Sequence, residues 1–232
     1  MRVSFLTSRK RSNVHALRDA ARLSTRLIGL HQEGTDLFLA RAPSTARATA
    51  TLLCSVHGLN LFIAAMDHLH RGRFDVAAYL YRPLRDLHGL VLDVCEDETR
   101  AEELLHSDKI FKAGLSRKLV EERLKAESPE LAELMGAALR SEDKWYQALA
   151  HTGSLHFNKT TQRTPGGIRE FRNDGVSDRR QAVSMSRGFI RDEVTLQMAL
   201  AIAWRETSIE WLLAVRRTAA EVSEWLGVTE GS

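Results

Sequence analysis

Cysteine, proline, aromatic residues and long apolar runs are all scarce in this chain of 232 residues. It has only two cysteines, Cys54 and Cys95, which excludes a disulfide scaffold and favours a reducing, cytoplasmic location. Its longest apolar run, residues 194–204, falls far short of the roughly 18 residues that a membrane span needs. The residues after Met1 also contain no apolar stretch long enough for a signal peptide, so we expect a protein without membrane segments.

Only 4 prolines and 14 glycines interrupt a sequence that is 44% hydrophobic and 27% charged, which excludes collagen-like and low-complexity classes. Apolar residues recur with helical spacing along most of the chain. The sequence therefore predicts an all-α fold, a single helical bundle of about six to seven helices over residues 1–232. We expect residues 1–11 and 228–232 to be flexible and the long last helix to kink or split. The expected helices span residues 12–30, 44–70, 74–97, 99–113, 115–127, 129–151 and 187–226.

The segment from residue 157 to residue 178 breaks the helical pattern. It contains two turn signals, PGG at residues 165–167 and NDG at residues 173–175. We expect a short hairpin or an irregular flap here, because loops of this length inside a domain are often functional or disordered. Arg169 and Arg172 in this flap are candidate binding residues.

Positive charge is concentrated in two parts of the chain, although the net charge is only +3. Residues 1–50 carry 9 basic and 3 acidic side chains, and residues 159–191 carry 8 basic and 3 acidic ones. Two basic segments on a near-neutral body can attract RNA or another polyanion. The alternative is that the abundance of arginine reflects a coding bias of the genome.

In the predicted helix at residues 74–97, the charged residues fall on two sides that are separate from the apolar stripe. At 100° per residue, Arg82 and Asp86 fall together one turn apart, while Arg85 and His88 fall on another side. An exposed Arg82–Asp86 pair would be an ordinary surface pair, whereas a buried one would point to specificity or function. Pro83 can kink the helix between them. The apolar stripe that we expect to face the core consists of Val76, Leu80, Leu84, Leu87, Val91 and Val94.

A second polar cluster is predicted where the helix at residues 129–151 ends. His151 stands at this end, and Gly153 is a natural helix stop. The helix dipole favours a protonated histidine at such a position. We therefore take His151 as a candidate catalytic residue, and Trp145 and His156 as candidate binding residues. The alternative is a capping histidine followed by a loop histidine.

Residues 78–86 (AYLYRPLRD) and 145–153 (WYQALAHTG) together resemble motifs of a group of uncharacterised bacterial all-helical proteins. In that group, a helix carrying Arg-Pro-Leu/Phe-aromatic-Glu precedes a helix that ends in Trp-x-x-Leu-x-x-x-His-Thr/Ser-Gly. The similarity covers residues 75–160. The group has no established activity, so the resemblance implies a helical fold and a shared polar cluster, and it implies no reaction.

The resemblance assigns Arg82, Asp86 and His151 to that shared polar cluster. The present sequence departs from the group at two positions, with Arg85 in place of the aromatic residue and Asp86 in place of the glutamate. The shorter acid keeps the charge and changes its reach. We expect Asp86 and Arg85 to be binding residues of this cluster.

A distant resemblance to the HEPN class suggests a second function, a metal-independent ribonuclease of a toxin or phage-defence system. Proteins of that class are helical bundles with an Arg-x4–6-His motif, and Arg82 and His88 have this spacing. Histidine would transfer the proton of the 2′-OH, and arginine would stabilise the charge of the phosphorane. The two side chains would point about 120° apart on an intact helix, so a kink or a dimer would have to bring them together. The same spacing also occurs elsewhere in this arginine-rich chain.

Metal binding has weaker support. Asp67 and His70, like Glu103 and His106, have the acid-x-x-His spacing of di-iron bundles, but such spacing is also typical of solvated helix faces. We expect no metal and no cofactor. Neither cysteine has a basic neighbour that would activate it as a nucleophile.

Three tryptophans, Trp204, Trp211 and Trp225, recur at seven and fourteen residues along the last predicted helix and form a stripe. Core packing is the first interpretation of this stripe, and a dimer seam is the alternative. We expect a homodimer, as is common for long amphipathic helices. The sequence favours a binding or interaction module slightly over an enzyme.

Overall fold

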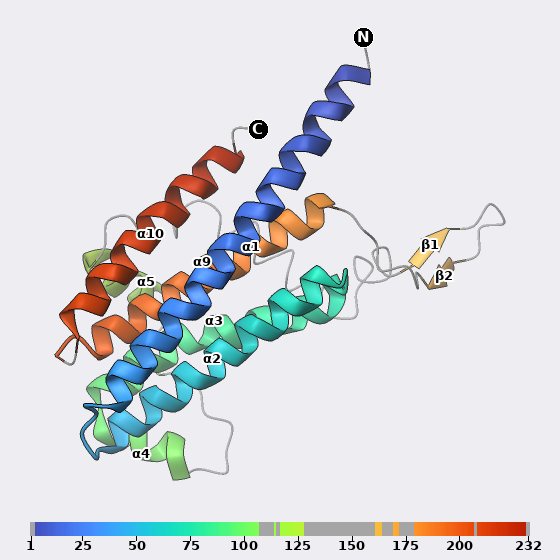
Figure 1. Cartoon of the computed structure of the whole chain (residues 1–232). Helices are drawn as coiled ribbons and strands as arrows, with labels where there is room; N and C mark the ends of the chain where they lie inside the picture. Colours follow the sequence, from blue (N-terminus) through green and yellow to red (C-terminus); the bar gives the residue numbers. More distant parts are fainter. Residues whose placement is uncertain are drawn as a thin grey trace.

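The computed structural model describes residues 3–106, 114, 117–127, 161–163, 169–171, 179–206 and 208–230. In these residues the chain forms an all-α bundle with one small pair of strands, which confirms the predicted fold class (Figure 1). The elements are α1 (Val3–Leu39), α2 (Ala46–His70), α3 (Phe74–Glu96), α4 (Glu98–His106), α5 (Arg117–Glu127), β1 (Thr161–Arg163), β2 (Arg169–Phe171), α9 (Arg179–Ala203) and α10 (Ile209–Glu230).

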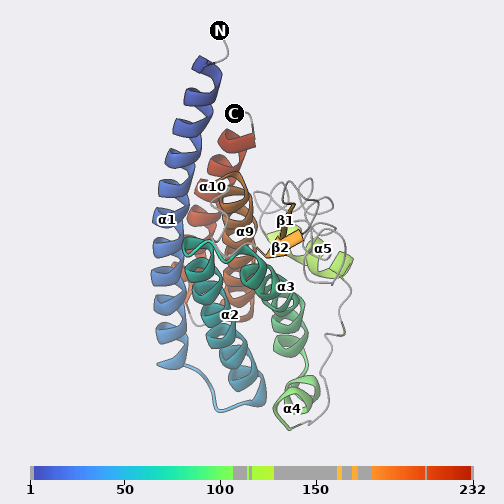
Figure 2. The same ribbon diagram turned by 90° about the vertical axis from the view of Figure 1, so that its right-hand side faces the viewer.

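The long helices pack in two layers. α1, α2 and α3 lie side by side in one layer, and α9 and α10 lie behind them, as Figure 2 shows. α9 is the central helix, because it packs against α1, α2, α3, α5 and α10. All residues from 188 to 201 of α9 are buried. A helix that is covered on every side is the natural centre of a bundle.

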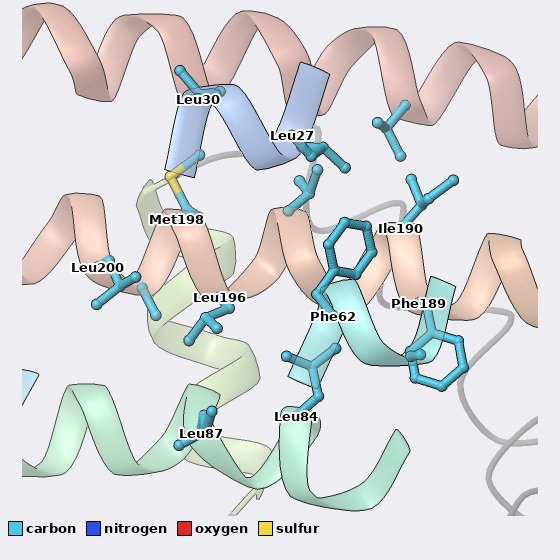
Figure 3. Packing of buried hydrophobic residues seen from close by; sticks show 14 of the residues in the cluster. Leu27, Leu30, Phe62, Leu84, Leu87, Phe189, Ile190, Leu196, Met198 and Leu200 are labelled. Atoms are coloured by element: carbon cyan, nitrogen blue, oxygen red, sulfur yellow. The ribbon is translucent and has the colours of Figure 1, made fainter. Parts of the chain in front are cut away.

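The core lies between these two layers (Figure 3). Leu27 of α1, Phe62 of α2, Leu84 of α3 and Leu196 of α9 have no exposed surface. Each such side chain contributes about 1.5–3 kcal/mol by leaving water. The predicted apolar stripe of α3 is largely confirmed, since its members from Leu84 onward are buried; it is wrong at Val76, which is 37% exposed.

Sequence signals set several helix ends. Thr45 is the N-cap of α2, and its hydroxyl accepts a hydrogen bond from the amide of Ala48 at 3.2 Å. Pro43 therefore lies before the helix. Gly72 joins α2 to α3 with a φ of 71°, a conformation that side chains rarely adopt. This short connection makes α2 and α3 adjacent.

The helix predicted at residues 187–226 is two helices. α9 begins earlier, at Arg179, and the chain turns after Ala203 into α10. Ser208 caps α10, because its hydroxyl accepts from the amide of Trp211 at 3.2 Å. The first helix is also longer than predicted: α1 begins at Val3, where flexible residues were expected, and continues to Leu39.

The tryptophans of the last predicted helix lie in the core. Trp204, Trp211 and Trp225 are 3%, 2% and 9% exposed, which confirms the first interpretation of the stripe. Phe38 stacks on Trp204 with ring centroids 4.2 Å apart. The indole of Trp211 donates to the carbonyl oxygen of Leu30 at 2.8 Å. A buried indole with a hydrogen-bond partner is a stable core element, so this stripe is not available as a dimer seam.

The two strands lie within the segment predicted as a hairpin or flap. β1 pairs antiparallel with β2, and the register sets Arg163 opposite Arg169. The strand pair lies outside the helical bundle (Figure 1). The helix predicted at residues 129–151 lies outside the described residues, as do residues 107–113 of the helix predicted at 99–113.

One described helix, α2, is long and apolar enough to cross a bilayer, judged by its length and composition. This differs from the expectation of a chain without any such segment. In the structure, 44% of its most apolar window is buried inside the bundle, against α1, α3, α4 and α9.

Candidate functional site

The Arg82–Asp86 pair predicted on α3 forms on the protein surface. Arg82 Nε lies 3.6 Å from Asp86 Oδ2, and the two side chains are 70% and 71% exposed. This agrees with the interpretation as a surface pair, which contributes only a few tenths of a kcal/mol. α3 continues through Pro83 without interruption from Phe74 to Glu96.

His88 lies on a different, buried side of α3. It is 5% exposed, and its Nε2 donates to the carbonyl oxygen of Asp192 at 2.9 Å. Burial is the main cause that lowers the pKa of His88 to about 4; Asp192 acts in the opposite direction, and the nearby Arg85 adds to the lowering. The imidazole is therefore neutral near pH 7.

Arg82 and His88 thus do not meet in one pocket within the chain. The arginine is in solvent, and the histidine is engaged in a contact between α3 and α9. The intact helix keeps them on different sides, as its geometry requires. Arg85 is half-buried, with its guanidinium 5.7 Å from the centre of the Tyr81 ring.

Other predicted site residues lie outside the described part of the chain. These are Trp145, His151, His156 and Arg172. Arg169 is described as a strand residue of β2, opposite Arg163. That His151 shares a polar cluster with Arg82 and Asp86 stays a prediction.

A buried polar network that the sequence patterns did not reveal joins α1, α2 and α9. His31 of α1 is at its centre: its Nδ1 lies 2.5 Å from Glu193 Oε1, and its Nε2 lies 2.8 Å from Ser55 Oγ. Thr35 extends the network to Ser55 at 2.8 Å. The amide of Gln197 donates to Glu193 Oε1, also at 2.8 Å. One carboxylate, one imidazole and three neutral groups are thereby connected.

Glu193, His31 and Ser55 follow the acid–base–nucleophile order of a catalytic triad. All three have no exposed surface, so the hydroxyl next to the imidazole is closed to a substrate in this structure. A buried and connected set of this kind fixes how helices pack, because each group would be costly to bury alone. We assign the network the role of fixing α9 between α1 and α2.

Two further charged residues of α9 are buried beside this network. Arg191 and Asp192 are each 2% exposed, and Arg191 donates to the hydroxyl of Tyr81 at 2.8 Å. A signal in the sequence that could have revealed these buried charges is the triplet RDE at residues 191–193, which interrupts an otherwise apolar stretch. The charge count included Arg191 in the basic segment at residues 159–191, but a buried arginine does not contribute to attracting a polyanion.

The residues considered for metal binding have other contacts. Asp67 Oδ1 accepts from Arg71 at 2.9 Å, and Glu103 accepts from Arg100 at 2.6 Å. Among the described residues, no group of three histidine, cysteine or acidic side chains could hold a metal ion.

The two cysteines are not activated. Burial raises the pKa of Cys54 to about 12, and burial together with Glu96 raises the pKa of Cys95 to about 11. Both thiols are free. Neither is therefore a thiolate near neutral pH.

Searches with family models, against curated proteins and against solved structures find no match to this chain.

Proposed function

We propose that this chain is a protein-interaction module and that it binds its partner through the outer face of α2. We call this face the α2 seam and define it by the exposed residues Thr49, Leu53, Val56, Asn60, Ile63 and Asp67. The observation that supports the proposal is its apolar character. Leu53, Val56 and Ile63 are 54%, 45% and 39% exposed, and residues 48–66 contain no Asp, Glu, Lys or Arg.

α10 also exposes apolar side chains, Ile209 at 67% and Leu213 at 49%, but it intersperses them with charged residues. The exposed side of α10, for example, carries Glu210, Arg217 and Glu224. Charged side chains are what a water-facing helix normally presents. A contiguous apolar surface on a folded domain usually marks a site of interaction. The composition of the α2 seam is therefore better suited to contact with a protein than to water.

The interior of the bundle supports a binding role over a chemical one. The described groups that come closest to a catalytic arrangement, His31, Ser55 and Glu193, are buried in contacts between helices, and so is His88. The ribonuclease alternative needs Arg82 and His88 together, and their placement gives it no support.

A polyanion is a less suitable partner than a protein. The α2 seam has no basic residue to attract phosphate groups. Of the basic segment at residues 159–191, Arg191 is buried and Arg187 donates to the carbonyl oxygen of Leu226 at 3.0 Å. Burial of Arg191 thus removes one positive charge from the surface of this segment.

A photo-crosslinking experiment tests the proposal. The residue p-benzoylphenylalanine is introduced in place of Val56 in the full chain, and cells that express it are irradiated. We expect a discrete crosslinked product whose second component, identified by mass spectrometry, is a protein. The control carries the same probe in place of Leu213, which is 49% exposed on α10. No product at position 56, or equal products at both positions, would contradict the proposal.

A further inference from the structure

We propose that the strand pair formed by β1 and β2 binds single-stranded nucleic acid. This inference goes beyond the proposed function, because the strand pair lies outside the helical bundle and is a different part of the chain from the α2 seam (Figure 1). The observation that carries the inference is the register of the two strands. Arg163 of β1 stands directly opposite Arg169 of β2.

Two arginines in directly opposite positions are unfavourable for a strand pair by itself. The Cβ atoms of such residues lie about 4.5–5.5 Å apart, and like charges at this separation destabilise the pairing. A pair of only two strands is at best marginally stable in water. An anion that accepts hydrogen bonds from both guanidinium groups offsets this repulsion, and the oxygens of a phosphate group are well suited to arginine. The register therefore favours a ligand that carries phosphate.

The alternation of residues along the strands separates the charges between the two faces of the pair. Residues two apart in a strand belong to the same face, so Thr161 and Phe171 share the face of the two arginines. Glu170, which is the single acidic residue of the two strands, belongs with Gln162 to the other face. The face of the two arginines therefore contains no carboxylate from the strands to neutralise it.

The sequence around the strands extends the positive charge beyond the opposed pair. Residues 159–172 contain the basic residues Lys159, Arg163, Arg169 and Arg172, and Glu170 is their single acid. A nucleic acid presents successive phosphates, and each one that a basic residue neutralises releases counterions and adds to the affinity. A free phosphate ion uses only one such contact site. The extended charge therefore favours a polymer of phosphates over a single ion.

Phe171 indicates which kind of nucleic acid is bound. It follows Arg169 by two residues, about 7 Å along the strand and on the same face. Proteins that bind single strands combine basic residues along the backbone with aromatic rings on which unstacked bases stack. Bases inside a duplex are already stacked, so a ring on a strand pair gives them no comparable contact. Binding to an anionic lipid surface relies on a large apolar face, whereas Phe171 is the single apolar residue of the two strands.

Fluorescence anisotropy with the purified full chain tests the inference. The probe is a labelled oligouridylate of about 12 nucleotides, and we expect a dissociation constant of about 1–100 μM at physiological salt. The double variant R163A/R169A should raise this constant at least about 10-fold. It should also reduce the slope of log K against log salt by about 1.4, since each phosphate contact of a single strand contributes about 0.7.

The matched control is R22A/R217A, which removes the same charge from exposed positions of α1 and α10. It should change the dissociation constant less than about 2-fold, because charges distant from the site are screened by salt. Thermal unfolding of both double variants should match that of the unaltered chain, because neither pair of substitutions removes a core residue.

Substitution of the aromatic ring tests the nature of the ligand. Phe171→Leu keeps an apolar side chain but removes the stacking surface, so it should weaken binding about 5- to 100-fold. Phe171→Trp should keep the affinity of the unaltered chain. If R163A/R169A weakens binding and Phe171→Leu does not, single-stranded nucleic acid is wrong as the ligand and the strand pair binds only a phosphate group.

Three other outcomes would overturn the inference. These are no binding of the oligouridylate at about 100 μM protein, equal losses in R163A/R169A and R22A/R217A, and binding to phosphatidylcholine–phosphatidylglycerol vesicles in place of the oligonucleotide. None of them affects the α2 seam, since crosslinking at position 56 reports on that face alone. The two proposals therefore fail or hold independently.

Discussion

His88 donates a hydrogen bond to Asp192 from inside the bundle, where an imidazolium would be costly. Its pKa is about 4 in the folded protein against 6.5 for an ordinary histidine, so between these values the unfolded chain binds more protons. Stability is then complete above pH 6.5 and falls as the pH falls towards 4. A pKa difference of this size corresponds to about 3 kcal/mol.

We therefore expect His88→Gln to flatten the dependence of unfolding free energy on pH between 6.5 and 4. Urea unfolding at several pH values measures this, and the comparison of slopes does not depend on the stability of the variant at pH 7. His57→Gln, which changes an exposed histidine of α2, is the control and should keep the slope of the unaltered chain. Equal slopes for His88→Gln and the unaltered chain would show that His88 charges as easily in the folded state.

Residue-level prediction worked where geometry is local. Helical phase correctly set Arg82 and Asp86 together and His88 apart from them, because 100° per residue needs no knowledge of the rest of the fold. The angular position of a residue around α3 does not tell which side of that helix another helix covers. For His88 that helix is α9, whose Asp192 is 104 residues away in sequence.

At the scale of helices, two glycines of α1 occupy opposite environments. A Cβ at Gly34 would come within 2.0–2.5 Å of three ring atoms of Trp211, whereas one at Gly29 meets nothing within 4 Å. Alanine is favoured over glycine inside a helix by about 1 kcal/mol at either position. We expect Gly29→Ala to stabilise the protein by up to that amount. We expect Gly34→Ala to destabilise it by about 1–3 kcal/mol, because it separates α1 from α10.

Chemical denaturation of the two alanine variants decides this prediction. Since both substitutions lie on one helix and have the same intrinsic helix preference, a difference in sign isolates the contact with Trp211. Similar effects at both positions would mean that α1 and α10 do not pack as closely as described.

Helices were easier to predict than their ends. The period of apolar residues identified the positions of α2 and α3. The split of the long last helix was expected, but its position was not predicted, although Ser208 with Glu210 after it is a helix-start signal, because the apolar period continues through it. The spacing of apolar residues shows which side of a helix is buried. It does not reveal a turn between two helices when the same spacing continues across that turn.

For the molecule as a whole, the contacts of His31 with Glu193 and Ser55 join three helices, α1, α9 and α2. Removal of one partner leaves the other polar group buried, so Glu193→Met should cost about 3–5 kcal/mol. His31→Leu should be similarly costly, and the double variant should cost less than the sum of the two. Glu221→Ala, which removes the partially exposed partner of Arg26, should cost less than about 1 kcal/mol. Strict additivity of the two core substitutions would contradict the network.

This network could not be predicted from the sequence. His31 and Glu193 are 162 residues apart, and either alone is compatible with a solvated helix face. Their pairing depends on α9 lying between α1 and α2, which is a property of the assembled bundle.

The central position of α9 also has a consequence for synthesis on the ribosome. The first three long helices present apolar flanks that this late helix covers, and the two ends of the His31–Glu193 contact are 162 residues apart. At about 5–20 residues per second, the nascent chain waits roughly 10–30 s before its centre emerges. During this interval the newly made N-terminal half depends on chaperones, or on its own loose collapse, to avoid aggregation.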